Sequence, residues 1–137
     1  MRLQHVILPS SDHMHAAEFL GLLFGIEPSP PAEIYPYSPS LRVGSMTFMF
    51  GEAEWVPKHL AFHVTPAEFD GILGRIREHS LTHGDGPWQA DNSKVKTGDS
   101  ANGYRAVWLH SPSPDTTLLE FFCFDVIPDG FSDPAVL

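Results

Sequence analysis

The sequence predicts an α+β fold in which a strand–helix–strands unit occurs twice. Short apolar runs typical of β-strands alternate with two segments that have helical periodicity. Each of these segments follows a strand-like run that contains a histidine, His5 in the first case and His59 in the second. The predicted elements follow the same order in the two halves, although the sequence identity between the halves is faint. This order indicates an internal duplication.

Size and composition are those of one globular domain. The chain has 137 residues, 42% of them hydrophobic and 18% charged. Eight Lys and Arg against 17 Asp and Glu give a formal net charge of −9, which argues against binding to nucleic acid or to an anionic membrane. The single cysteine, Cys123, excludes an internal disulfide. No apolar run approaches the length of a membrane span. We therefore expect a soluble cytoplasmic protein.

The first unit begins with LQHVIL (3–8), which predicts a strand. Residues 12–24 have apolar side chains at helical spacing and are followed by a glycine, so we expect a helix there. Residues 27–40 contain five prolines, a pattern that predicts an edge strand or an irregular loop. Two short apolar runs, 41–43 and 46–50, flank a Gly-Ser pair and predict a hairpin.

The second unit begins with another apolar run, HLAFHV (59–64). The sequence TPAE at 65–68 has the pattern of a helix capping box with proline at the first helical position. Residues 83–103 are rich in Gly, Asp, Asn and Ser, and a loop of that length is typical of a binding loop or lid. The runs 106–110 and 116–124 predict the last two strands.

We accordingly expect a single domain over residues 1–137. Its first module would span about 1–54, its second module about 55–126, and a C-terminal tail 127–137.

Three residues in the predicted strands are candidates for metal ligands: His5, His59 and Glu120. Two imidazoles and one carboxylate are the donors of an open site for a divalent metal. Glu120 lies between apolar residues on both faces of its strand, so it must be paired, protonated or metal-bound if it is buried. The alternatives are packed or surface histidines, and a salt bridge from Glu120 to one of three cations, Arg42, Arg105 or Lys58.

These stretches resemble the vicinal oxygen chelate superfamily, which includes glyoxalase I, fosfomycin-resistance thiol transferases, bleomycin-resistance proteins and extradiol dioxygenases. The resemblance lies in LQHVIL with His5, KHLAFHVTPAEFDGIL with His59 and TLLEFF with Glu120. It implies two βαβββ modules whose mixed sheets curve, barrel-like, around a metal pocket. It also implies that these three residues hold a divalent Fe, Mn, Zn or Ni ion.

The sequence departs from the glyoxalase I pattern in the first module. Glyoxalase I members place a second Glu on the last strand of that module. Here the region reads SMTFMFGE, with Thr47, Phe48 and Met49 where the carboxylate is expected and Glu52 as the nearest acid. The resemblance therefore implies an open three-ligand site and disfavours glyoxalase activity.

The resulting hypothesis is a metal-dependent enzyme with lyase, transferase or dioxygenase chemistry on a small oxygen-bearing substrate. Glu120, His63 and Tyr104 are the candidate catalytic residues, the last two for proton transfer. The expected apolar wall consists of Phe48, Phe50, Phe62, Trp108 and Phe122.

Two other functions remain open: a non-catalytic binding or resistance protein of the same fold, and an enzyme-like fold without metal. The resemblance further implies a homodimer, in which His5 of one chain serves with His59 and Glu120 of the other.

Overall fold

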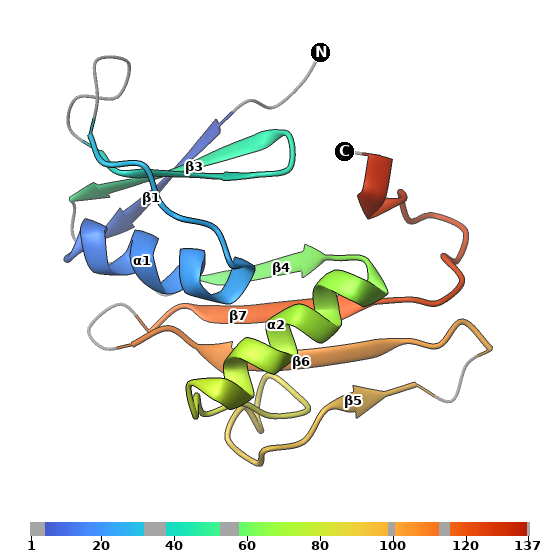
Figure 1. The fold of residues 1–137 in the computed structure, drawn as a ribbon. Helices are drawn as coiled ribbons and strands as arrows, with labels where there is room; N and C mark the ends of the chain where they lie inside the picture. Colours follow the sequence, from blue (N-terminus) through green and yellow to red (C-terminus); the bar gives the residue numbers. More distant parts are fainter. Residues whose placement is uncertain (1–4, 32–37, 53–57, 99–100, 113–115, 137) are drawn as a thin grey trace. The chain divides into compact units, whose positions relative to one another are not determined.

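The computed structural model describes residues 5–31, 38–52, 58–98, 101–112 and 116–136 (Figure 1). The fold is α+β, as the sequence predicts, because each half combines one mixed sheet with one helix. The chain divides into a first compact unit up to residue 57 and a second that begins at residue 58. Each unit is described by itself. Part of the proline-rich segment (32–37) and of the last predicted turn (113–115) lies outside the described residues.

The first unit is a three-stranded sheet with one helix, in the strand order β1-β3-β2. Strands β1 and β3 are parallel, and β2 and β3 form the predicted antiparallel hairpin. The helix begins after Asp12, whose side chain accepts a hydrogen bond from a backbone N–H, and ends at Gly25 with φ of 68°. The elements are β1 (His5–Ser10), α1 (His13–Phe24), β2 (Ser40–Val43) and β3 (Met46–Glu52).

The second unit is a complete βαβββ module with the strand order β4-β7-β6-β5. Strand β4 is parallel to β7, and the other pairs are antiparallel. The two-residue β5 lies in the stretch predicted as a loop, where polar residues carry no strand signal. The elements are β4 (His59–His63), α2 (Pro66–Glu78), β5 (Lys96–Thr97), β6 (Arg105–His110), β7 (Leu118–Cys123) and a 3-10 turn, Pro134–Val136.

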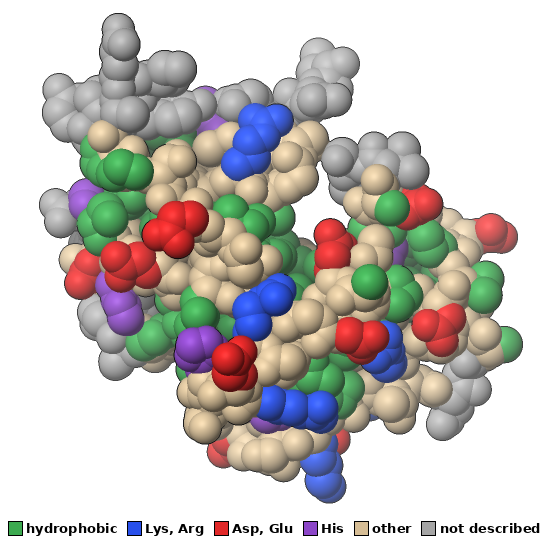
Figure 2. All heavy atoms as spheres, viewed as in Figure 1, with side chains coloured by type: hydrophobic (Ala, Val, Ile, Leu, Met, Phe, Trp, Pro, Cys, Tyr) green, Lys and Arg blue, Asp and Glu red, His purple; other side chains and the backbone are tan. Residues whose placement is uncertain are grey.

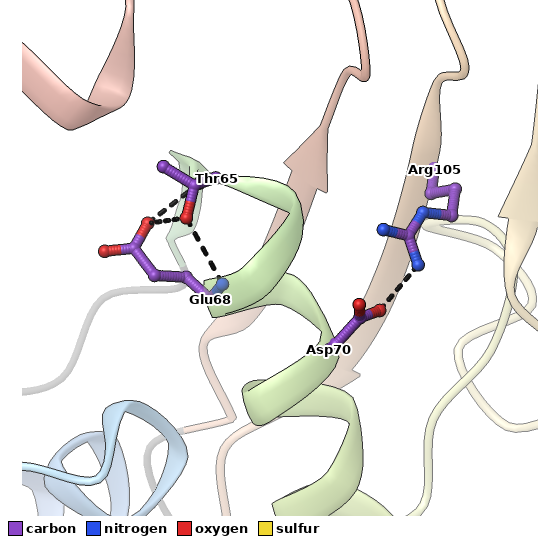
Figure 3. A network of polar contacts seen from close by, with 4 residues as sticks. All are labelled: Thr65, Glu68, Asp70 and Arg105. Carbon is purple, nitrogen blue, oxygen red and sulfur yellow. Dashed lines mark hydrogen bonds and ion pairs between the residues drawn. The ribbon is translucent and has the colours of Figure 1, made fainter.

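The predicted capping box at the start of α2 is present (Figure 3). The Glu68 backbone N–H donates to the Thr65 hydroxyl at 3.2 Å, and the Thr65 backbone N–H donates to the Glu68 carboxylate at 2.8 Å. One turn further, Asp70 accepts a hydrogen bond of 2.7 Å from Arg105 on β6. The Arg105 guanidinium also lies 4.8 Å from the centre of the Phe69 ring. These contacts fix α2 on one face of the sheet.

The core of the second unit lies between α2 and that face of the sheet. Alternation along each strand sends every second side chain to α2. On β7, Phe121 is completely buried and stacks on Phe62 of β4, with ring centres 5.3 Å apart. The helix contributes four buried apolar residues at helical spacing: Phe69, Ile72, Leu73 and Ile76.

Cys123 is completely buried on the same face. Burial raises the pKa of its thiol, and the nearby Arg105 opposes this only in part. Because the folded pKa lies above the unfolded value of about 8.5, the unfolded chain loses its proton first as the pH rises.

We therefore expect the free energy of unfolding to fall as the pH rises above about 8.5, with a slope of up to about 1.4 kcal/mol per pH unit. Urea denaturation at several pH values measures this slope. Cys123→Ala should flatten it, because the variant has no thiol to titrate. Equal slopes in both proteins would refute the assignment to this thiol.

On the face that Figure 2 shows, acidic and basic side chains are mixed, and the described Lys and Arg side chains form no continuous basic area. Within the described part of the chain, no helix is both long and apolar enough to cross a membrane.

Candidate functional site

The second face of the β4-β7-β6 sheet carries the candidate residues. Strand register sorts their side chains into cross-strand rows. One row joins His59, Leu118 and His110, and the next joins Ala61, Glu120 and Trp108. A third row joins His63, Phe122 and Ala106. We call the face formed by these three rows the site face.

His59 and Glu120 contact each other on the site face. They stand diagonally across the parallel pair β4 and β7, a separation that long side chains can bridge. His59 Nε2 donates to Glu120 Oε2 at 3.0 Å. The carboxylate side chain is 17% exposed and the imidazole 46% exposed, so the pair is open to solvent on one side. Arg105, one of the cations considered as a partner for Glu120, instead binds Asp70 on the opposite face.

The geometry of this pair fits two adjacent ligands of one metal ion. Ligand atoms at about 2.1 Å from a metal and at right angles to each other are roughly 3 Å apart. The Nε2–Oε2 distance of 3.0 Å has this value. Imidazole and carboxylate are also the donor types that divalent Fe, Mn, Zn and Ni accept.

The hydroxyl of Tyr104 is within the electrostatic influence of Glu120. Burial, and after it the negative charge of Glu120, raises the pKa of the Tyr104 phenol. Its ring centre is 6.5 Å from that of Phe122 and 5.4 Å from that of Phe124. The phenol therefore keeps its proton at neutral pH and is a hydrogen-bond donor on this side of the sheet.

Trp108 has a buried indole N–H without a hydrogen-bond partner among the described residues. It is directly opposite Glu120 on β6, and its side chain packs with Ala90 and Ala106. A buried donor left unpaired costs free energy, so its retention requires an explanation. The sequence indicated Trp108 only as part of an apolar wall, because the missing partner depends on the fold.

His63 lies within a group of aromatic rings on the site face. Its imidazole is stacked on Phe122 with ring centres 5.0 Å apart and an interplanar angle of 2°. Phe124 and Phe131 meet the imidazole edge-on at 5.6 and 5.8 Å. Phe131 comes from the tail after β7, for which the sequence had no functional signal. These contacts hold the His63 ring in one orientation.

His5 belongs to the first unit and is the first residue of β1, as His59 is the first residue of β4. His5 pairs with Thr47 on the parallel strand β3, whereas His59 pairs with Leu118. Glu120 lies two residues after Leu118 on β7. Met49 lies two residues after Thr47 on β3 and is therefore the equivalent residue of the first unit. The duplicated position thus carries a thioether where the second unit has a carboxylate. Glu52 is the last residue of β3.

Within the described residues, no three His, Cys, Asp or Glu side chains gather in an arrangement suited to a metal ion. The structure thus brings together two of the three predicted ligands, His59 and Glu120. The third, His5, is described within its own unit.

Three residues of the predicted apolar wall point away from the strand faces that carry His5 and His59. Phe62 stacks on Phe121, toward α2. Phe48 and Phe50 pair with Val6 and Leu8, in the rows that alternate with that of His5. Phe48 and Phe50 are buried, with 7% and 3% of their surface exposed. Strict alternation along the strands excludes all three from the rows that carry the histidines. Trp108 and Phe122 do lie on the site face.

Several solved structures share this fold. Oxidase ChaP-H1 is 30% identical, with a TM-score of 0.75 over 96% of this chain and 99% of that one. Oxidase ChaP-H2 is 26% identical, with a TM-score of 0.75 over 95% and 96%. A glyoxalase / bleomycin resistance protein from Catenulispora acidiphila is 19% identical, with a TM-score of 0.61 over 93% and 100%. No protein-family model and no curated protein matches the chain.

The strand–helix–strands units, the paired His59 and Glu120, and the extent of these similarities define one class of protein. The chain belongs to the vicinal oxygen chelate superfamily.

Proposed function

We propose that this protein is a metal-dependent oxidase that acts on a small molecule with two neighbouring oxygen atoms. The observation that carries the proposal is the contact of 3.0 Å between His59 and Glu120 on an open sheet face. Two proteins similar over nearly their whole length, at 30% and 26% identity, are named oxidases. This favours oxygen chemistry over lyase or transferase chemistry.

The metal ligands in this proposal are His59, Glu120 and His5. Two histidines and one carboxylate form the ligand set of non-haem iron oxygenases, which leaves positions open for substrate. A divalent metal bound there would act as a Lewis acid toward substrate oxygens. Met49 at the position equivalent to Glu120 supports three protein ligands rather than four.

The surrounding residues would bind and orient the substrate. The protonated Tyr104 hydroxyl can donate a hydrogen bond to a substrate oxygen, and the unpaired Trp108 N–H is available to donate a second. The Phe122 ring, on which the His63 imidazole is stacked, supplies an apolar surface that helps to exclude water. His63 is also our candidate for moving a proton during the reaction.

Metal binding tests the proposal without a known substrate. Purified chain should bind one equivalent of Mn²⁺, measured by loss of the free-ion signal in electron paramagnetic resonance. It should also retain one equivalent of a transition metal in elemental analysis. Oxygen uptake in the presence of a panel of catechols and enediols then distinguishes an oxidase from a non-catalytic binding protein. A chain that binds no divalent metal would contradict the proposal.

A further inference from the structure

The second unit also contains a pocket that the proposed function does not use. A pocket of about 200 Å³ lies between the loop that follows α2 and the end of β6. This volume is below the range of pockets that enclose a drug-sized molecule, so it suits a small ligand or the head group of a larger one. The lining residues are Thr82, Pro87, Trp88, Ala90, Asp91 and His110.

The loop that forms this pocket is held firmly in place. Gly84 and Trp108 exchange two backbone hydrogen bonds, at 2.9 and 3.0 Å, so the loop pairs with the edge of β6. Asn92 binds Asp85 through both its amide nitrogen and its amide oxygen. A side chain at Gly84 would overlap the carbonyl oxygen of Gln89, so the tight turn requires glycine there. These contacts hold the loop backbone on both sides of the segment that carries Trp88.

Trp88 is the unusual residue on this loop, because its side chain is 90% exposed. Tryptophan is highly buried on average, and Trp108 on the adjacent strand is only 7% exposed. A large indole on a rigid loop beside a pocket offers a flat face to a ligand at little cost in conformational entropy.

The charge of the lining indicates the kind of ligand. Asp91 is the only acidic residue among the six lining residues, and neither Lys nor Arg is among them. An aromatic face attracts cations, and a carboxylate beside it adds to this attraction. The net charge of −9 also favours the approach of cations.

We propose that the pocket binds an organic cation, an ammonium or guanidinium group, between the Trp88 indole and the Asp91 carboxylate. His110 and Thr82 line the remaining wall and can accept hydrogen bonds from an N–H or a hydroxyl group of the ligand. His110 belongs both to this pocket and to the site face, but neither His59 nor Glu120 lines the pocket, and its ligand needs no metal.

Choline and its neutral carbon isostere, 3,3-dimethylbutan-1-ol, test this proposal in metal-free full-length protein. Two-dimensional amide NMR follows residues 82–91 during each titration. We expect saturable shifts with choline and at least about fivefold weaker binding of the isostere. Trp88→Ala and Asp91→Asn should each weaken choline binding about fivefold, which corresponds to about 1 kcal/mol.

Asp129→Asn is the matched control, since it removes one exposed carboxylate from the tail and should leave choline binding unchanged. Equal binding of choline and the isostere, or equal weakening by both Asp variants, would overturn the proposal.

A comparison of n-butylammonium with the peptide acetyl-Gly-Lys-Gly-amide identifies the source of the cation. Similar affinities indicate free amines, and a peptide more than tenfold tighter indicates a protein side chain.

Discussion

Glu120→Gln should weaken divalent metal binding about a hundredfold or more. The amide keeps the size of the side chain but removes the negative charge that faces His59 at 3.0 Å. Changes to residues that only support a metal ligand already cost 10- to 100-fold in affinity, so loss of a ligand charge should cost at least as much. Mn²⁺ titration of the wild-type protein and the variant measures the difference.

The same substitution should leave the fold intact. His59 is 46% exposed, and ion pairs at that exposure contribute about 1 kcal/mol or less to stability. The urea midpoint of Glu120→Gln should therefore stay close to that of the wild type. Unchanged metal affinity in a folded variant would remove Glu120 from the site and leave the pair as a structural contact.

A mixing experiment addresses the third ligand. His5→Ala should weaken metal binding as Glu120→Gln does. If His5 serves the site of a partner chain in a homodimer, a mixed dimer of the two variants contains one intact site. Co-refolding should then restore about a quarter of the wild-type sites. No restoration would indicate that each chain builds its own site or that His5 is no ligand.

Phe121→Ala should destabilise the protein by about 4 kcal/mol. The ring is fully buried between the sheet and α2 and stacks on Phe62. Its removal leaves a cavity that the surrounding strands cannot fill. Because domains of this size are typically stable by 5–15 kcal/mol, the variant should be partly unfolded at moderate urea concentrations. Equilibrium urea denaturation measures the loss.

Phe131→Ala is the matched control for this prediction. Its ring is 48% exposed and touches the aromatic group only at its edges. We expect a loss of at most about 1 kcal/mol. Comparable losses in the two variants would contradict the assignment of the core to the α2 side of the sheet.

Local signals in the sequence predicted most of the secondary structure. Proline after Thr65 and Glu three residues later predicted the start of α2, because these residue types satisfy the free backbone groups of a helix end. Gly25 predicted the end of α1, because it adopts positive φ without strain. The two-residue β5 was missed, since so short a strand forms from pairing with β6 rather than from its own residues.

The candidate site was predicted less completely. Alternation places His59, Glu120 and Phe122 on a common face only once the register of β4 and β7 is known. The same alternation excludes Phe62 from that face, although its aromatic character suggested a pocket wall. The unpaired N–H of Trp108 depends on what packs around it, which no local pattern contains.

Met49 at the position equivalent to Glu120 has a consequence for the charge of the proposed metal site. A dication held by two neutral histidines and one carboxylate keeps a net charge of +1, whereas a second carboxylate would make the centre neutral. The residual positive charge favours ligands whose oxygens are already deprotonated, and it lowers the pKa of any hydroxyl that binds there. In the proposed three-ligand site, a thioether instead of a second carboxylate would therefore give an electrostatic preference for anionic oxygens.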